Sequence, residues 1–167
     1  EKIKYTHSGV YSSSLAIDKE VSKKIFKKNK ILTPPSFKVT SIHKRIQKKI
    51  IKKINNSFKF PVVIKPLNEG SSVGVYICNN KNFIKNLYKL KDYNEILVEK
   101  YIPGREIQAA VLGKKKLGAI ELIPSRKFYD YKAKYQKNAK TKHLMPAPLS
   151  QINLSLIHIS EPTRHTR

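Results

Sequence analysis

The segment from Phe60 to Val75 constrains the fold of this chain more than any other. It is a β-branched run that carries one lysine, Lys65, followed by the small-residue loop Glu69–Gly74 and a second β-branched run. Such runs predict two strands. A lysine inside an apolar strand is costly unless an anion meets it, and a loop of small residues lets backbone N–H groups cradle phosphate. The segment therefore predicts a nucleotide-phosphate site, although it is neither a Walker A motif nor a Rossmann glycine fingerprint.

Hydrophobic periodicity predicts the remaining elements. Three serines at 12–14 offer N-cap hydroxyls, and apolar residues then recur every four positions, so we expect one helix over about 14–29. Isoleucines at 42, 46, 50 and 54 predict a second helix, and a third is expected over about 80–91. Strands are expected at 36–40, 61–65, 75–78 and 95–101, and a hairpin at 106–112 with 117–123. Residues 124–147 show no clean period and are expected to form a long loop.

The charge of the chain is extreme, with 35 Lys and Arg against 11 Asp and Glu and a formal net charge of +24. One interpretation is a basic nucleic-acid-binding module. The other is biased coding in a lysine-rich proteome. The lysines are spread along the whole chain, and only 5 of the basic residues are arginine, the residue best suited to bidentate phosphate contacts. Biased coding is therefore the favoured interpretation, and we expect no nucleic-acid partner.

Other features bear on the compartment and on the end of the chain. Cys78 is the only cysteine, so no intramolecular disulfide can form, which suits a reducing cytoplasm. No apolar stretch approaches the ~18 residues of a membrane span, so no membrane partner is expected. Residues 154–167 contain none of the 30 lysines and resemble translated sequencing-adapter read-through, so 151–167 are expected to be a non-native tail.

Further residues have the chemistry to bind a nucleotide. Glu99 and Lys100 end an apolar strand and precede Ile102, an edge that offers a carboxylate and apolar flanks to adenine. Glu106 follows seven residues after Glu99, within reach of a ribose hydroxyl pair. The loop 128–135 interleaves aromatic and basic residues and could be a lid that places a lysine on phosphate. Each feature alone is more often a surface ion pair or ordinary aromatic packing, but their order along one chain favours a site.

These motifs together resemble the D-alanine–D-alanine ligases of the ATP-grasp superfamily. The resemblance covers about residues 3–150 and rests on the segments 5–10, 17–19, 63–66, 69–74, 98–106 and 128–135. It implies an α+β ATP-grasp fold in which 1–14 is a linker from a missing N-terminal domain. Residues 15–103 would form the small nucleotide-binding subdomain, and 104–150 would begin the large subdomain with a lid at 124–147.

The resemblance also implies roles for individual residues. ATP would be bound by ten residues: Lys19, Lys65, Gly70, Ser71, Ser72, Glu99, Lys100, Ile102, Glu106 and Lys134. The catalytic residues would be Ser71, Lys134 and Tyr135, with Ser71 and Tyr135 hydrogen-bonded to each other beside the first D-alanine. Lys132, Met145 and His7 stand where the family usually has Glu, Cys and Gly, and the first two put the details of lid closure in doubt.

The implied reaction is ATP-dependent ligation of two D-alanines through a D-alanyl phosphate, which the amine of the second D-alanine attacks. It would serve peptidoglycan precursor synthesis in the cytoplasm, catalysed by a homodimer with Mg²⁺ or Mn²⁺. The family's metal ligands are expected after residue 150 and none is here, so we expect no metal ligand in this chain and an inactive fragment. The alternative within the superfamily is another carboxylate–amine ligase.

Overall fold

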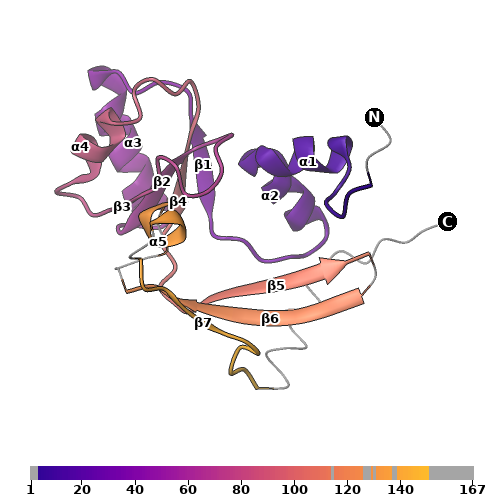
Figure 1. Ribbon diagram of the computed structural model, residues 1–167. Helices are drawn as coiled ribbons and strands as arrows, with labels where there is room; N and C mark the ends of the chain where they lie inside the picture. Colours follow the sequence, from indigo (N-terminus) through magenta and orange to yellow (C-terminus); the bar gives the residue numbers. More distant parts are fainter. Residues whose placement is uncertain (1–3, 114, 126–128, 130, 137–138, 151–167) are drawn as a thin grey trace. The chain divides into compact units, whose positions relative to one another are not determined.

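The structure, a computed structural model, describes residues 4–113, 115–125, 129, 131–136 and 139–150. The described residues form two compact units. One unit is Gly9–Pro103, and the other consists of the residues before Gly9 and those from Gly104 on. Both combine helices or turns with antiparallel strands (Figure 1), which confirms the expected α+β class. In the part of the chain that the structure describes, no helix has the length and apolar character needed to cross a bilayer.

The Gly9–Pro103 unit is built on a four-stranded antiparallel sheet in the order β1-β4-β2-β3. The strands are β1 (Ser36–Val39), β2 (Val62–Pro66), β3 (Tyr76–Cys78) and β4 (Ile96–Lys100), and the helices are α1 (Val10–Ile17), α2 (Lys19–Lys28), α3 (Lys44–Ser57) and α4 (Phe83–Tyr88). The strands expected from the β-branched runs are all present, with ends displaced by at most one residue. The third predicted helix is shorter than 80–91, because Asn79 and Asn82 bond each other's backbone N–H groups and form a turn before it.

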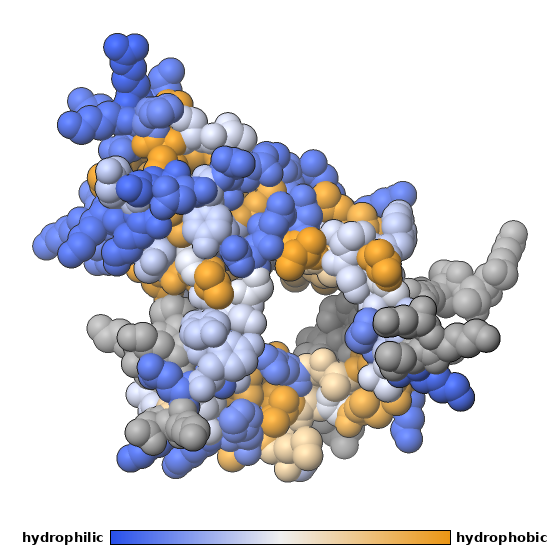
Figure 2. Space-filling view, turned by 45° about the horizontal axis from the view of Figure 1, so that its top comes forward, coloured by the Kyte–Doolittle hydropathy of each residue, from blue (hydrophilic) through white to orange (hydrophobic). Residues whose placement is uncertain are grey.

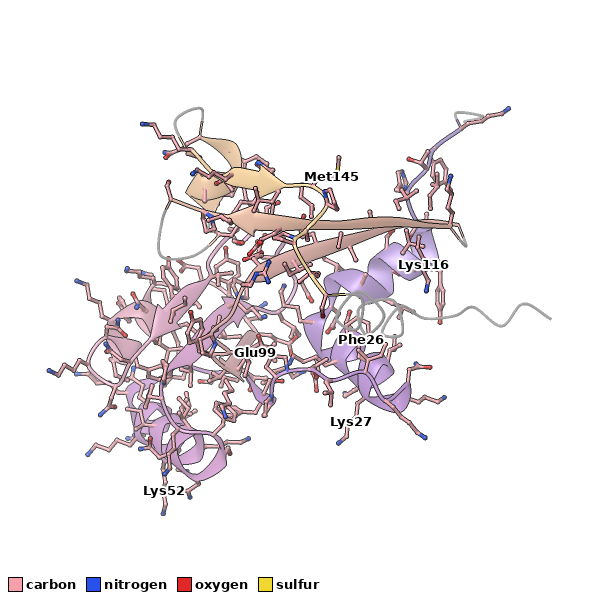
Figure 3. The ribbon with its side chains drawn as sticks, turned by 90° about the horizontal axis from the view of Figure 1, so that it is seen from below. Phe26, Lys27, Lys52, Glu99, Lys116 and Met145 are labelled. Atoms are coloured by element: carbon pink, nitrogen blue, oxygen red, sulfur yellow. The ribbon has the colours of Figure 1, made fainter. Side chains whose placement is uncertain are left out.

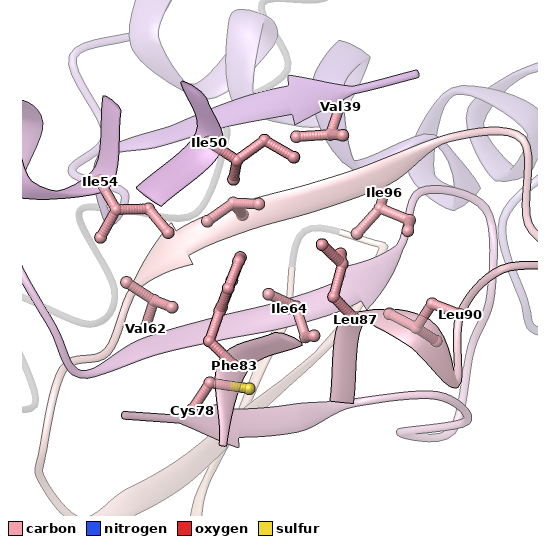
Figure 4. Close-up of a cluster of buried hydrophobic side chains, with 11 residues drawn as sticks. Val39, Ile50, Ile54, Val62, Ile64, Cys78, Phe83, Leu87, Leu90 and Ile96 are labelled. Carbon is pink, nitrogen blue, oxygen red and sulfur yellow. The ribbon is translucent and has the colours of Figure 1, made fainter. Parts of the chain in front are cut away.

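The core of this unit lies between one face of the sheet and the helices α3 and α4 (Figure 4). The isoleucine spacing of α3 buries Ile50 and Ile54, and α4 buries Phe83 and Leu87. Alternation along β2 turns Val62 and other even-numbered residues toward these helices. The other members of the cluster come from the sheet and from the end of α4: Val39, Ile64, Cys78, Leu90, Ile96 and Val98.

The single helix expected over 14–29 is wrong, because the chain forms two helices that meet at Asp18. Asp18 has an extended backbone, and its carboxylate accepts hydrogen bonds from the N–H groups of Glu20 and Val21 at 2.8 and 3.0 Å. An aspartate at an N-cap stabilises a new helix start, so it interrupts an apolar pattern that continues across it. The three serines expected as N-caps lie inside α1 instead, whose N-cap is Gly9. Asn29 ends α2, as expected.

The second unit contains a three-stranded antiparallel sheet in the order β5-β6-β7. Its strands are β5 (Glu106–Leu112), β6 (Lys115–Ile123) and β7 (Lys142–Leu144), and α5 spans Tyr131–Tyr135. The hairpin of β5 and β6 confirms the sequence prediction. The uninterrupted loop expected over 124–147 is wrong, because α5 and β7 lie within it. These elements are too short to show a period. The expectations for Phe128, Asp130 and the tail 151–167 fall outside the described residues.

An arginine–carboxylate pair ties the start of β5 to β6. Arg105 donates from Nε and Nη2 to the two carboxylate oxygens of Glu121, each at 2.6 Å, and Nη2 also reaches the Pro148 carbonyl at 3.1 Å. Glu121 is buried, with 6% of its surface exposed. The Arg105 guanidinium lowers the pKa of the Glu121 carboxyl. A bidentate pair of this kind is both strong and directional.

The surface of the chain is polar over wide areas. Figure 2 shows one face, on which hydrophilic side chains spread over much of the surface with apolar ones between them. Several large apolar side chains are exposed on α1 and just after α2, among them Val10, Tyr11 and Leu32. The helices α1 and α2 bury no residue completely.

A first prediction concerns Gly74, whose φ of +66° lies in the left-handed region. A Cβ there would come within 2.8 Å of the Pro66 Cγ and 3.1 Å of the Leu90 Cδ2. We expect Gly74→Ala to lower the free energy of unfolding by about 1–3 kcal/mol, measured by denaturant titration. Gly70→Ala is the matched control, because nothing lies within 4 Å of its Cβ position. Equal stability of the two variants would contradict this reading of the loop.

A second prediction concerns the pH dependence of the Arg105–Glu121 pair. Because the folded state lowers the pKa of Glu121, the pair stabilises the fold above the carboxyl's ordinary pKa of about 4.3 and loses that contribution as pH falls through the lowered value. Arg105→Met should therefore lower the melting temperature at neutral pH, and its deficit relative to Arg45→Met should shrink in acid. A deficit independent of pH would show that the guanidinium acts only by packing.

Candidate nucleotide site

The register of the sheet places Lys65 and Glu99 on the same face, opposite the core. Val63 pairs with Glu99, and Lys65 pairs with Leu97. Paired residues of an antiparallel ladder point to the same side, and successive residues alternate. The core takes Ile64 and Val98, so the lysine and the glutamate face the other way and lie diagonally across two neighbouring strands.

Glu99 is the centre of a triad of charges on this face. Its Oε1 atom lies 2.8 Å from the Lys65 Nζ, and its Oε2 atom lies 2.6 Å from the Lys23 Nζ of α2. The side chain of Glu99 is 10% exposed, that of Lys23 17% and that of Lys65 20%. Lys65, the lysine in the apolar strand, is thus paired with a carboxylate of its own chain. This ion pair offsets the free-energy cost of partly burying the ammonium group.

Lys19 approaches the same region from the first turn of α2. The Asp18 cap fixes this turn, and the Lys19 Nζ donates to the Leu67 carbonyl at 2.9 Å and to the Glu69 carbonyl. Burial lowers the pKa of Lys19, and the nearby Lys65 ammonium lowers it further. Two cations therefore stand close enough to repel each other, next to the loop that follows β2.

The predicted loop forms a tight turn beside these cations. Ser71 and Ser72 have φ values of 50° and 63°, and the turn is closed by a hydrogen bond from the Val73 N–H to the Gly70 carbonyl at 2.9 Å. Ser71 is exposed and Ser72 is half-buried. Successive residues in turn conformations can form a concave set of N–H donors that accepts an anion.

The predicted adenine edge lies at the end of β4. The backbone N–H of Lys100 donates to the Pro35 carbonyl at 2.9 Å, and the side chain of Lys100 is exposed. Ile102 is 55% exposed. The strand end therefore presents an apolar side chain and a long cation to solvent, a short distance along the chain from the buried Glu99.

The other unit carries the remaining predicted residues. Glu106 begins β5, partial desolvation raises the pKa of its carboxyl, and the Lys134 ammonium opposes that rise. Lys134 lies in α5 with its Nζ 5.1 Å from the centre of the Tyr129 ring. The ring centroids of Tyr131 and Tyr135 lie 4.8 Å apart, with the ring planes tilted by 48°. The structure thus brings Glu106 and Lys134 together. The bond between Ser71 and Tyr135 joins different units and stays a prediction.

Lys23 is the site residue that sequence reasoning missed. It carries no motif, and it is one of 30 lysines, so composition hides it. A signal was nevertheless available, because Lys19 and Lys23 are four residues apart and share one face of a helix. In Figure 3 Glu99 lies inside the fold, whereas Lys27 on the same helix as Lys23 projects outward.

The described residues include no group of three His, Cys, Asp or Glu side chains that could hold a metal ion. An open hollow of about 420 Å³ adjoins the base of the loop. None of the predicted nucleotide ligands lines it; its walls are formed by Pro66, Leu67, Asn68, Glu69, Asp92, Tyr93, Asn94 and Glu95. The charged triad and the Ser-rich turn are therefore the candidate nucleotide site.

Comparison with known proteins finds related ligases. The D-alanine--D-alanine ligase of Pelagibacter ubique is 63% identical over 157 residues, which are 94% of this chain and 51% of that protein. The crystal structure of D-alanine--D-alanine ligase from Bacillus anthracis matches with a TM-score of 0.72 and 31% identity, over 92% of this chain and 49% of that one. The structure of the Bacillus anthracis ligase complexed with ATP matches with a TM-score of 0.63 and 27% identity, over 95% and 52% of the two chains.

The chain thus spans about half the length of the relatives that it matches. Its similarity to these ligase structures shows the ATP-grasp fold that the sequence motifs implied. Residues 25–160 match the family described as D-ala D-ala ligase C-terminus. This match extends over most of the chain, and the chain therefore belongs to the D-alanine–D-alanine ligase C-terminal family.

Proposed function

We propose that the complete gene product joins two D-alanines at the expense of ATP, for peptidoglycan precursor synthesis. The observation that carries the proposal is the convergence of Lys19 and Lys65 beside the Ser71–Ser72 turn. Burial and mutual repulsion lower the pKa of Lys19, and an anion between the two ammonium groups would relieve both costs. A relative with the same fold was solved with ATP bound.

The residues of the Gly9–Pro103 unit would bind ATP as follows. Lys19 and Lys65 neutralise phosphate oxygens, and the turn formed by Gly70, Ser71 and Ser72 donates N–H and hydroxyl groups to them. Glu99 and Lys100 face the polar edge of adenine, and Ile102 covers one face of the ring. ATP supplies the phosphoryl group, and the protein contributes fixed positive charge where negative charge grows.

The other unit would complete the site. Glu106 accepts hydrogen bonds from the ribose hydroxyls, and the nearby Lys134 reaches a phosphate when the segment 124–147 closes as a lid. Ser71 and Tyr135 orient the first D-alanine, whose carboxylate is activated for attack by the amine of the second. Under this proposal, 15–103 is the small nucleotide-binding subdomain, 104–150 begins the large one, and 1–14 leads from a preceding domain.

The proposal also covers the setting of the reaction. Mg²⁺ or Mn²⁺ would assist phosphoryl transfer in the complete protein, but the described residues do not fit a metal site, so no step is assigned to it here. We expect a cytoplasmic homodimer without a nucleic-acid partner. The spread of the lysines along the whole sequence favours biased coding over a dedicated basic groove.

The deciding experiment is an assay of phosphate release by the complete gene product with ATP and D-alanine. We expect turnover that requires D-alanine, and Lys65→Met should lower kcat/KM by about 100-fold or more, by analogy with the loss of one oxyanion donor. Lys52→Met, on the exposed face of α3, removes the same charge elsewhere and should leave turnover unchanged.

Three results would contradict parts of the proposal. Turnover with another carboxylate and none with D-alanine would make the protein a different carboxylate–amine ligase. Unchanged turnover in Lys65→Met would remove that lysine from the phosphate site. Tight binding to a nucleic acid, with a steep loss of affinity as the salt concentration rises and without ATP turnover, would favour the basic binding module instead.

The lowered pKa of Lys19 gives an independent test of the anion site. Bound phosphate favours the protonated amine and raises this pKa, so ATP binding in alkaline buffer should take up a proton, whereas binding near neutral pH should not. Calorimetry in two buffers of different ionisation enthalpy measures this uptake. Lys19→Arg keeps the cation but cannot titrate, and should abolish the uptake. Uptake that persists in this variant would assign the proton to another group.

A further inference from the structure

The helix α2 is attached to the sheet by charges rather than by a buried apolar face. None of its residues is fully buried. The Lys23 Nζ, which touches Glu99, also donates to the Pro34 carbonyl at 2.6 Å. Glu20 of the same helix pairs with Lys38 of β1 at 3.0 Å. Lys23 is therefore the member of α2 that reaches the buried carboxylate of the candidate site.

The two cations bind Glu99 through different oxygens. Lys65 contacts Oε1, and Lys23 contacts Oε2. The contact of Lys23 therefore does not use the oxygen that Lys65 binds. Lys65 is the one that the proposed function also assigns to phosphate, so a bound phosphate and the Glu99 carboxylate compete for the same ammonium group.

We propose that Lys23 is a positioning residue for ATP binding, because it keeps the Glu99 carboxylate paired when Lys65 turns to phosphate. The inference rests on the proposed function, and it deepens that function at the same site. A buried carboxylate that loses its last cation is strongly destabilised. With Lys23 present, Glu99 keeps one ion pair and one fixed orientation, so the transfer of Lys65 costs little.

Replacement of Lys23 changes this exchange. In Lys23→Met, Lys65 is the one cation still paired with Glu99 among the described residues, and phosphate gains Lys65 by taking it from the carboxylate. We expect the affinity for ATP to fall about tenfold or more, the usual effect of losing a hydrogen bond to a charged group. Adenosine has no phosphate and does not recruit Lys65, so its affinity should change little.

The rival explanation is that Lys23 only fastens α2 to the sheet. A loosened α2 would displace Lys19 and lower the melting temperature, and Lys23→Arg, with its different shape, would not restore the original position fully. Both explanations predict a selective loss of ATP affinity in Lys23→Met, because a displaced Lys19 also weakens phosphate binding alone. Lys23→Arg separates them: it restores a cation on Glu99 and should restore ATP affinity, whereas the loss persists if Lys23 only fastens α2.

The experiment is calorimetric titration of the complete gene product with ATP and with adenosine. The variants are Lys23→Met, Lys23→Arg and the matched control Lys27→Met, which removes an exposed lysine from the same helix. We expect Lys23→Met to lose ATP affinity selectively, and Lys23→Arg and Lys27→Met to bind both ligands as the original protein does. A selective loss that Lys23→Arg restores supports the inference.

A second background completes the test. When Glu99→Gln removes the carboxylate charge, Lys23 has nothing to neutralise, so adding Lys23→Met should then change ATP affinity less than about twofold. If Lys23→Met binds ATP normally, or loses ATP and adenosine affinity equally, the inference is overturned and the proposed function stands. If the original protein binds no ATP, the proposed function fails first.

Discussion

The carboxylate of Glu99 is the constraint on which the Gly9–Pro103 unit depends. It is buried, it lies on the sheet face away from the core, and it takes one lysine from β2 and one from α2. In a chain with 35 basic and 11 acidic residues, few carboxylates are available to pair with lysines inside the fold. Because this one binds two cations through separate oxygens, it links a neighbouring strand to the helix that carries Lys19.

This ionic attachment differs in kind from the packing on the other face of the sheet. There, α3 and α4 are held by apolar side chains that interlock with the strands, and their position does not depend on charge. The helices α1 and α2 keep large apolar side chains exposed, and α2 is attached to the sheet and its flanking segments through ammonium groups, carboxylates and carbonyl oxygens. Polar contacts of this kind can be exchanged for contacts with a ligand, whereas a packed core cannot be.

The strands and α3 could be predicted from sequence because burial determines them. The β-branched runs and the four-residue isoleucine spacing each match one geometry. The break at Asp18 could not be predicted from periodicity, because a cap acts through one local hydrogen-bonding side chain. The elements α5 and β7 could not be predicted either, because they are too short to show a hydrophobic period. Lys65 and Glu99 stood out as charges in apolar strands, while Lys23 was hidden among similar lysines on a polar helix.

Motif reasoning assigned Lys65 to phosphate and Glu99 to adenine, as two independent ligands. The structure shows that they are bonded to each other, which changes the energetics of the site. A ligand that binds both must first compete with their mutual attraction, so its affinity reflects the difference between new contacts and the pair it replaces. Because Lys23 remains on Glu99, breaking the Lys65–Glu99 pair costs less free energy, and the net gain from binding the ligand is larger. The value of Lys23 to the site therefore depends on the contact it maintains rather than on any contact with the nucleotide.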